Sequence, residues 1–386
     1  MTQILALLTD SYRELNSRKL FWITMLLSGL VVGVFAAFGL NDKGISFLWW
    51  QFDTPLLSAK TIEPRKFYIF AFANLGIPIW LTWAAMILAL ISTSSIFPDF
   101  IAGGAIELTL SKPISRMRLF LVKYVLGLLF VVLQVGVFSL ACFLVIGVRG
   151  ESWEPSLFLA VPIVTLVFSY LFGVCVLVGM MTRSTIAALL ATLLFWLFLW
   201  GLNTTDGIFV LQRETSIVNH ERAQKRVERQ ELASRRRIEQ LAAAGEPVPT
   251  ADTLPANVRD ELEAVNAFLA PARKEAADAE ESAAFWKRWT RLIVGAKTVL
   301  PKTVDTTALL DRWLLTPEDK ALFSPERGES GDPDGKVRFG QPDREVQKRA
   351  EEAVRGRTVY WVIGTSLGFE ALVVLVAGWL FCRRDF

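Results

Sequence analysis

The sequence predicts an all-α membrane protein with six transmembrane helices, an N-terminal interfacial helix and a large helical extracytoplasmic insert between helices 5 and 6. Two observations predict this class. Hydrophobic residues make up 53% of the chain, and they lie in long blocks rather than in alternating patterns. The segment 203–358, by contrast, is rich in alanine and in charged residues of both signs. The chain therefore divides into a membrane part and one polar insert.

Six apolar blocks approach or exceed the roughly 20 residues that a helix needs to cross a bilayer core about 30 Å thick. They cover residues 20–40, 67–92, 119–148, 156–181, 184–202 and 359–381. The fourth and fifth are separated only by Thr182 and Arg183. A single overlong segment would hold Arg183 in the middle of the bilayer at high cost, so a tight turn at the surface is expected. Pro78 and Pro162 are expected to interrupt the second and fourth helices.

Residues 1–19 precede the first block. Ile4, Leu8, Tyr12 and Leu15 recur at helical spacing with charged residues on the other faces, which favours an interfacial elbow helix over a frayed, solvated leader.

The orientation follows from lysine and arginine, because positive residues in short loops are retained on the cytoplasmic side. An inner-membrane location with both termini cytoplasmic places nine basic residues inside: Arg13, Arg18, Lys19, Lys112, Arg116, Arg118, Arg183, Arg383 and Arg384. The short loop 149–155 then lies outside and contains Arg149 against Glu151 and Glu154. Residues 359–386 form helix 6 and a cytoplasmic tail.

The insert shows two helical patterns. A polar helix is predicted over 215–244, ended by Gly245, Pro247 and Pro249. A second helix is predicted before Pro271, because an apolar stripe recurs at helical spacing; the stripe consists of Leu254, Val258, Leu262, Val265 and Leu269. We expect the two helices to pack as a hairpin.

Residues 20–202 hold helices 1–5 and, between helices 2 and 3, the Gly- and Pro-punctuated segment 93–118. It contains the sequence IELTLSKPISR at 106–116. This sequence resembles a loop of type-2 ABC exporter permeases, in which an acidic residue, a Leu-rich turn, a basic residue, Pro and a Ser-Arg pair open the next helix. The resemblance implies that the coupling to an ATPase is made by Glu107, Leu108, Lys112, Pro113 and Arg116. The alternative is a solvated turn whose charges only fix topology.

The resemblance implies a permease subunit of an ATP-driven exporter that works with two copies of an ATPase subunit. It also implies a second permease copy, as a homodimer or as a pair with a similar subunit. Because no Gly-x-x-x-x-Gly-Lys-Ser/Thr sequence occurs, ATP hydrolysis is expected in the partner and not in this chain. With His220 as its one histidine, the chain lacks a His-Glu-x-x-His motif, and neither a metal, a cofactor nor a nucleic acid is expected.

A function of another class is a non-transporting membrane scaffold that needs no ATPase. In that case the insert 203–358 would bind an extracytoplasmic partner.

Glu370 lies near the middle of the last apolar block, where a carboxyl is expensive unless it is protonated, paired or facing a wet cavity. It is a candidate for the translocation path. Alternatively, Thr365, Ser366 or Asn74 satisfies it as a structural hydrogen bond.

Two glycine pairs with small-residue spacing lie in the first and last blocks: Gly29 with Gly33, and Gly364 with Gly368. They predict close helix packing in the lipid membrane, either in a dimer or within the chain.

Overall fold

The computed structural model describes residues 19–42, 44–53, 58, 62–102, 115–249, 260–316 and 343–383. The predicted elbow segment 1–19 falls outside these residues except for Lys19, and so does the core of segment 93–118, including Glu107, Leu108, Lys112 and Pro113. Within the described residues, five helical segments are long and apolar enough to cross a membrane: Pro64–Ile101, Arg116–Arg149, Pro155–Thr182, Thr185–Ala244 and Tyr360–Arg383. Phe21–Ala37 is apolar but shorter.

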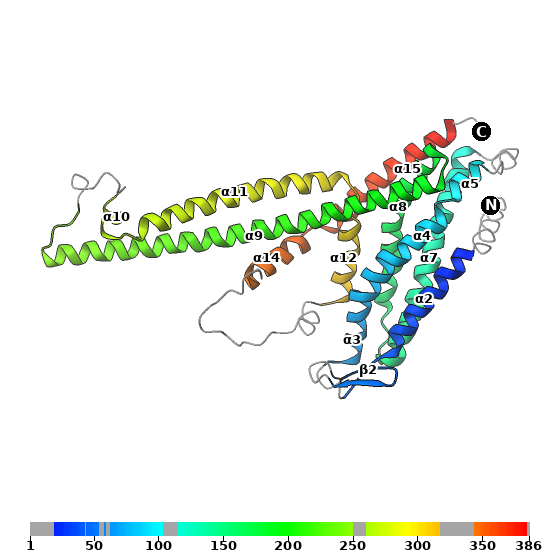
Figure 1. The fold of residues 1–386 in the computed structure, drawn as a ribbon, viewed down its shortest axis with the longest axis horizontal. Coiled ribbons are helices and arrows are strands. Elements are labelled where there is room, and N and C mark those ends of the chain that lie inside the picture. Colours follow the sequence, from blue (N-terminus) through cyan, green and yellow to red (C-terminus); the bar gives the residue numbers. More distant parts are fainter. Residues whose placement is uncertain are drawn as a thin grey trace. The chain divides into compact units, whose positions relative to one another are not determined.

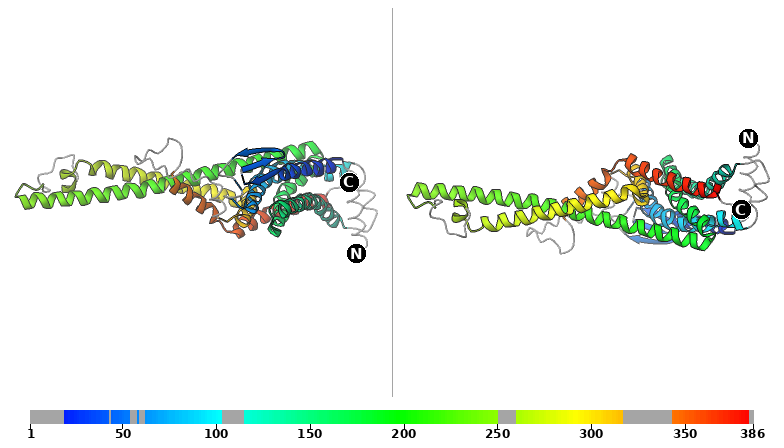
Figure 2. Two further views of the ribbon diagram at one scale, coloured as in Figure 1. Left: turned by 90° about the horizontal axis from the view of Figure 1, so that it is seen from below. Right: turned by 90° about the horizontal axis from the view of Figure 1, so that it is seen from above.

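The chain forms two compact units (Figures 1 and 2). Unit 1 consists of Met1–Gly201, Thr298–Gly331 and Val359–Phe386, and unit 2 consists of Leu202–Lys297 and Asp332–Thr358.

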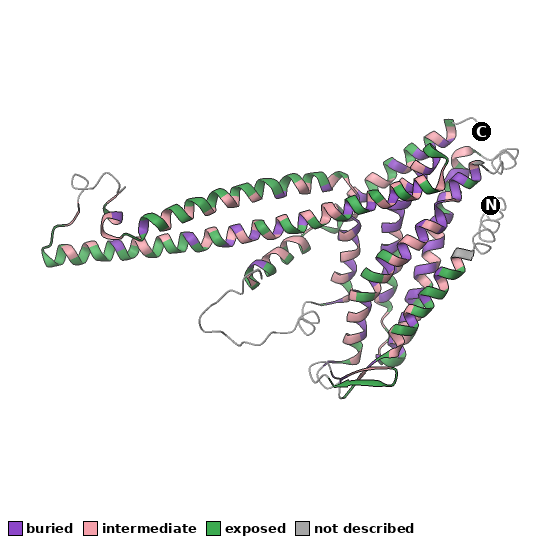
Figure 3. Ribbon diagram, in the orientation of Figure 1, coloured by how far each residue is buried: buried purple, intermediate pink, exposed green. Residues whose placement is uncertain are grey.

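Unit 1 is a helix bundle. Its helices are α2 (Lys19–Ala37), α3 (Pro64–Ala71), η1 (Phe72–Ala85), α4 (Met86–Thr93), α5 (Ile96–Ala102), α7 (Arg116–Arg149), η2 (Pro155–Leu159), α8 (Ala160–Thr182), the first part of α9 (Thr185–Ala244), α12 (Thr303–Leu314), η4 (Tyr360–Gly364) and α15 (Thr365–Arg383). Of the five spanning segments, the one containing α8 is the most buried, so α8 is the central helix (Figure 3). Both α7 and α15 pack against it.

A small antiparallel sheet follows α2, which corrects the all-α prediction. Its strands are β1 (Phe38–Asn41), β2 (Gly44–Phe47) and β3 (Trp50–Asp53), in the order β1-β2-β3. Phe38 pairs with Phe47, and Phe47 pairs with Trp50. The first predicted block extended to Leu40, but α2 ends at Ala37 because the aromatic and β-branched residues that follow are divided by tight turns and suit short strands.

The two prolines behave differently. Pro78 lies within η1, a π-helical stretch, so its missing N–H is accommodated by a widened helix rather than by a break. The prediction that Pro162 interrupts the fourth span is wrong, because Pro162 is the third residue of α8. The N–H that proline lacks is there one of the first four, which have no partner within a helix.

The predicted turn between the fourth and fifth spans is confirmed. Helix α8 ends at Thr182 and α9 begins at Thr185. Arg183 has φ 53°, the left-handed conformation that commonly ends a helix.

In unit 2 the later part of α9 lies alongside α11 (Leu269–Val299) (Figures 1 and 2). The Ser216 and Ser282 hydroxyls are 3.2 Å apart, and the Arg226 guanidinium lies 2.9 Å from Glu275 Oε1. The hairpin partner of α9 is therefore α11. Helix α9 ends at Ala244, as predicted, with Gly245 at φ 72°, but it is continuous from Thr185 rather than beginning near Thr215.

The predicted stripe helix is wrong in its extent. Helix α10 (Glu261–Val265) is short, and Leu269 already belongs to α11; Leu254 and Val258 lie outside the described residues. Asn266 separates the two helices, because its side chain donates to Gln230 O at 3.2 Å and accepts from Phe268 N at 3.1 Å. Side-chain bonds of this kind compete with a continuing helix.

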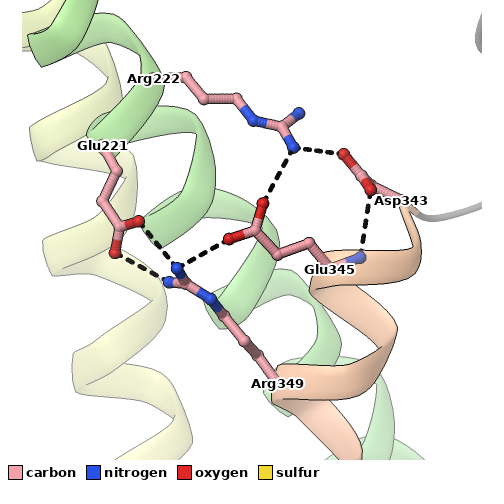
Figure 4. Close-up of polar contacts among 5 residues, drawn as sticks. All are labelled: Glu221, Arg222, Asp343, Glu345 and Arg349. Carbon is pink, nitrogen blue, oxygen red and sulfur yellow. Dashed lines mark hydrogen bonds and ion pairs between the residues drawn. The ribbon is translucent and has the colours of Figure 1, made fainter.

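Helix α14 (Arg344–Arg355) is held on α9 by ion pairs (Figure 4). The Arg349 guanidinium makes two bonds to Glu221, at 2.8 and 3.0 Å, and one to Glu345 at 2.9 Å. The Arg222 guanidinium contacts Asp343 and Glu345. These groups are partly exposed, so we expect each pair to contribute little to stability. The network as a whole is expected to fix the register of α14 on α9.

A second network of unit 2 is buried. Asp206 lies between Lys297 Nζ, 2.8 Å from Oδ2, and the Arg357 guanidinium, 2.7 Å from the same oxygen. Asp206 and Lys297 are 2% and 4% exposed. Asp206 and Lys297 lie near the two ends of the first segment of unit 2 and Arg357 lies near the end of the second, so the network joins both segments of unit 2.

Candidate functional site

The start of α7 is anchored to the end of α15 within unit 1. The residue before α7, Ser115, is its N-cap, and its hydroxyl accepts from Arg118 N at 3.4 Å. Arg116 opens the helix, as the resemblance implied. Its guanidinium donates to Cys382 O in the last turn of α15, at 3.2 Å. A cation at a helix C-terminus satisfies an orphan carbonyl and opposes the negative end of the helix dipole.

The contact continues along both helices. A Cβ on Gly378 of α15 would lie 2.9 Å from Met117 Sδ and 3.3 Å from the Phe120 ring, so the two helices approach closely there. Phe381 and Phe120 pack with ring centroids 5.8 Å apart. We call these contacts between the two helices, which join Arg116 to Cys382, Met117 to Gly378 and Phe120 to Phe381, the α7–α15 seam.

Further from the helix ends, the contacts between α7 and α15 continue to Glu370. Tyr124 Oη donates to Glu370 Oε1 at 2.9 Å, and Ser169 Oγ donates to Oε2 at 2.8 Å. Tyr124 and Ser169 are buried, 6% and 4% exposed, while Glu370 is half-buried. The carboxyl therefore joins α7, α8 and α15 at one point.

The donors suggested for Glu370 by sequence do not contact it through the described hydrogen bonds. Thr365 donates to Trp361 O at 2.7 Å, Ser366 to Val362 O at 2.7 Å, and Asn74 to Phe70 O at 3.0 Å. Sequence reasoning missed Tyr124 and Ser169. The available signal was the occurrence of these hydroxyl-bearing residues inside otherwise apolar blocks, where a polar side chain seeks a partner on another helix.

More polar side chains lie around Ser366, which precedes Glu370 by one turn on α15. Lys302, 2% exposed, places Nζ 4.3 Å from the centre of the Trp361 ring, and its backbone N–H donates to Ser366 Oγ at 3.0 Å. Tyr170 on α8 is fully buried, and its hydroxyl has no hydrogen-bond partner among the described residues. A row of polar side chains thus crosses the junction of α8, α12 and α15.

The other flank of segment 93–118 also packs against the bundle. Phe97 of α5 packs against Phe120 of α7, with centroids 5.3 Å apart. Lys123 Nζ lies 5.1 Å from the centre of the Phe100 ring, a cation–π distance. Both helices that flank segment 93–118, α5 and α7, therefore pack against the bundle next to the α7–α15 seam.

The four predicted packing glycines make no close helix contact. A Cβ on Gly29, Gly33, Gly364 or Gly368 would meet no atom of the described residues within 4 Å, and all four positions are exposed. These four glycines therefore do not allow a close approach between helices of the described residues. Close approach occurs instead at Gly378 and at Gly127, where a Cβ would lie 2.4 Å from the Phe172 ring.

Comparison with protein-family models, with curated proteins and with solved structures found no match to this chain.

Proposed function

We propose that this chain is the membrane-spanning permease subunit of an ATP-driven exporter of the ABC type, and that a separate ATPase acts on its segment 93–118. The observation that carries the proposal is the anchoring of both flanks of that segment. Its N-terminal flank, α5, is fixed through Phe97 and Phe100, and its C-terminal flank, Arg116, is bonded to the end of α15. A push on the segment therefore reaches packed helices, not a loose loop.

The seam supports a mechanical role for two spans at once. Because α15 contacts α7 at Cys382, Gly378 and Glu370 in turn, displacement of the start of α7 carries the last span with it. Ser169 extends the coupling to the central helix α8. Packed interfaces of this kind have few alternative arrangements, so a small shift at one end is transmitted as a rigid-body movement.

The layout proposed for the membrane has six spans, with Phe21–Ala37 in the first. The end of α5, the α8–α9 turn and the end of α15 lie at the same end of unit 1, and the sheet lies at the opposite end (Figure 1). The first end holds five described basic residues, Arg116, Arg118, Lys123, Arg183 and Arg383, against Arg65, Lys66 and Arg149 at the sheet end, so the positive-inside rule favours the first end as the cytoplasmic one. Unit 2 is then the extracytoplasmic insert.

Glu370 and the polar row beside it are proposed to line the translocation path, since a carboxyl inside a span is retained where it faces a partner or water. The assembly contains two copies of the permease and two of the ATPase. The four exposed glycines on α2 and on η4 and α15 are available to a second copy.

The test is recovery of an ATPase with the full chain. The tagged protein is purified from its native cells in mild detergent, and nucleotide-binding proteins are quantified by mass spectrometry for the wild type, Glu107→Ala and the matched control Glu151→Ala in the loop at the other end. A lost charge-assisted bond of about 1.5–3 kcal/mol corresponds to roughly 10- to 100-fold weaker binding. Recovery with the wild type and the control, but not with Glu107→Ala, supports the proposal. Preparations without any ATPase refute it and favour the scaffold.

A further inference from the structure

Unit 1 contains an apolar cavity that the proposed mechanism does not use. Its volume is about 580 Å³, and it is enclosed by α2, the first two strands, α3, η1 and α7. Its wall includes Phe35, Phe72, Gly76, Trp80 and Phe138. A cavity of this size suits one ligand of moderate size, and an apolar lining disfavours water as its content.

The cavity opens to the apolar flank of the bundle. Val34 on α2 and Leu75 and Ile79 on η1 line it and are 45%, 59% and 61% exposed. Because these residues belong to apolar helical segments, matter entering between α2 and η1 comes from the membrane. The widened π-helix η1 supplies much of the wall, consistent with the frequent occurrence of π-helical turns at binding sites.

One cation, Arg149, lies beside the lining at the sheet end of the cavity. Arg149 follows Cys142, which lines the cavity, by two helical turns on the same face of α7. Its guanidinium donates to Phe38 O at 3.3 Å, and Tyr68 Oη donates to the same carbonyl at 2.8 Å; both Phe38 and Tyr68 line the cavity. The carbonyl is neutral, so this contact leaves the charge of Arg149 uncompensated.

A second cation lies next to it. The Arg65 Cα is 3.5 Å from the Cβ position of Gly150, the residue after Arg149. Arg65 also precedes Phe67 and Tyr68 of the lining by one turn or less. Its guanidinium is paired with Glu154 at 2.7 Å, so Arg149 rather than Arg65 is the candidate partner of an anionic group.

We propose that the cavity binds one acyl chain of an anionic phospholipid, with the phosphate of the headgroup beside Arg149. The acyl chain is the apolar material available at the opening, and filling the cavity restores the dispersion contacts that an empty one would lack. The cation at the sheet end selects the charge of the headgroup. The site is separate from the seam, and its test needs no ATPase.

The site is tested by native mass spectrometry of the delipidated full chain in detergent, titrated with phosphatidylglycerol or phosphatidylcholine of equal chain length. We expect one lipid to be retained at activation energies that remove the others, with phosphatidylglycerol bound about fivefold more tightly, as one nearby cation implies. Arg149→Gln keeps a donor for Phe38 O and should reduce this preference below about twofold.

Two variants fill the cavity from different helices. Gly76→Leu extends from a position where Cβ has ordinary contacts with Phe72 and Phe138, and Ala71→Leu does so from α3. Each should abolish the retained lipid, whereas Gly136→Leu, whose Cβ would meet no described atom within 4 Å, should keep it. Thermal unfolding identifies a variant that has lost its fold. Equal lipid retention in a folded filled variant and in Gly136→Leu overturns the site, and equal affinity for the two lipids overturns the role of Arg149.

Discussion

Removal of the Glu370 carboxyl should leave the stability of the bundle almost unchanged. Both hydroxyls that bond it have a second acceptor in place. Tyr124 Oη lies 3.1 Å from Ser169 O, and Ser169 Oγ lies 2.8 Å from Leu166 O. Glu370→Leu therefore leaves no buried donor without a partner, and the penalty of about 1–3 kcal/mol for an unsatisfied group does not arise.

The remaining terms nearly cancel. Two hydrogen bonds are lost, each with a net value of about 0.5–1.5 kcal/mol. The cost of holding an acidic group within a span, about 2.5–3.5 kcal/mol at a helix centre when it is ionised, is relieved. We expect a net change within about 1 kcal/mol, which corresponds to a shift of the unfolding midpoint of no more than roughly 2–4 °C.

The assay is size-exclusion chromatography of detergent-solubilised protein after heating, for the wild type, Glu370→Leu and Glu370→Gln. Glutamine keeps an acceptor for Tyr124 and controls for the change of shape. Midpoints that coincide for all three proteins would mean that the carboxyl is not needed for stability, in agreement with its proposed role in the translocation path. A fall of more than about 6 °C for leucine, or loss of the variant from the membrane, would refute this reasoning and make Glu370 a structural residue.

Three further outcomes are expected. Asp206→Ala leaves two cations facing one another in unit 2 and should lower the free energy of local opening, measured by hydrogen exchange, by roughly 3–5 kcal/mol. Asp343→Ala removes a more exposed pair and should lower it by less than about 1 kcal/mol. Similar decreases for the two variants would contradict the argument from burial. Arg222 holds the pKa of Asp343 below its usual value of about 3.9, so the stabilisation from this pair is complete above about pH 4 and is lost as pH falls through the lowered folded-state pKa. Hydrogen exchange of α14, corrected for intrinsic rates, should therefore be equal at pH 7 and pH 5 and should rise only below about pH 4. A rise between pH 7 and pH 5 would contradict this prediction. Gly127→Leu drives a side chain into a neighbouring ring and should lower the midpoint by the equivalent of about 1–3 kcal/mol, while Gly136→Leu, in open space, should leave it unchanged.

Apolar block length predicted most of the membrane part because it measures a property of a single segment. The turn at Arg183 followed from the cost of a buried cation, and the start of α7 at Arg116 followed from the resemblance of its Ser-Arg pair to a known loop. The sheet was missed because its strands are four residues each and lie at the end of an apolar block, where helix and strand patterns cannot be separated by periodicity.

The candidate site was predicted one residue at a time and not as an arrangement. Glu370 was identified because any carboxyl in a span stands out. Its partners Tyr124 and Ser169 are distant in sequence, and which helices lie together is decided by packing at positions such as Gly378. The break at Asn266 was missed for a similar reason, since it depends on a bond to Gln230 of another helix.

The turn at Arg183 has a consequence for the order in which the chain enters the bilayer. Two residues link α8 to α9, and two extended residues reach at most about 7 Å, far less than the roughly 30 Å of the hydrocarbon core. In the proposed six-span layout, α9 therefore crosses the core in the opposite direction directly after α8. The two helices are then expected to insert as a pair, with Arg183 at the side from which they enter.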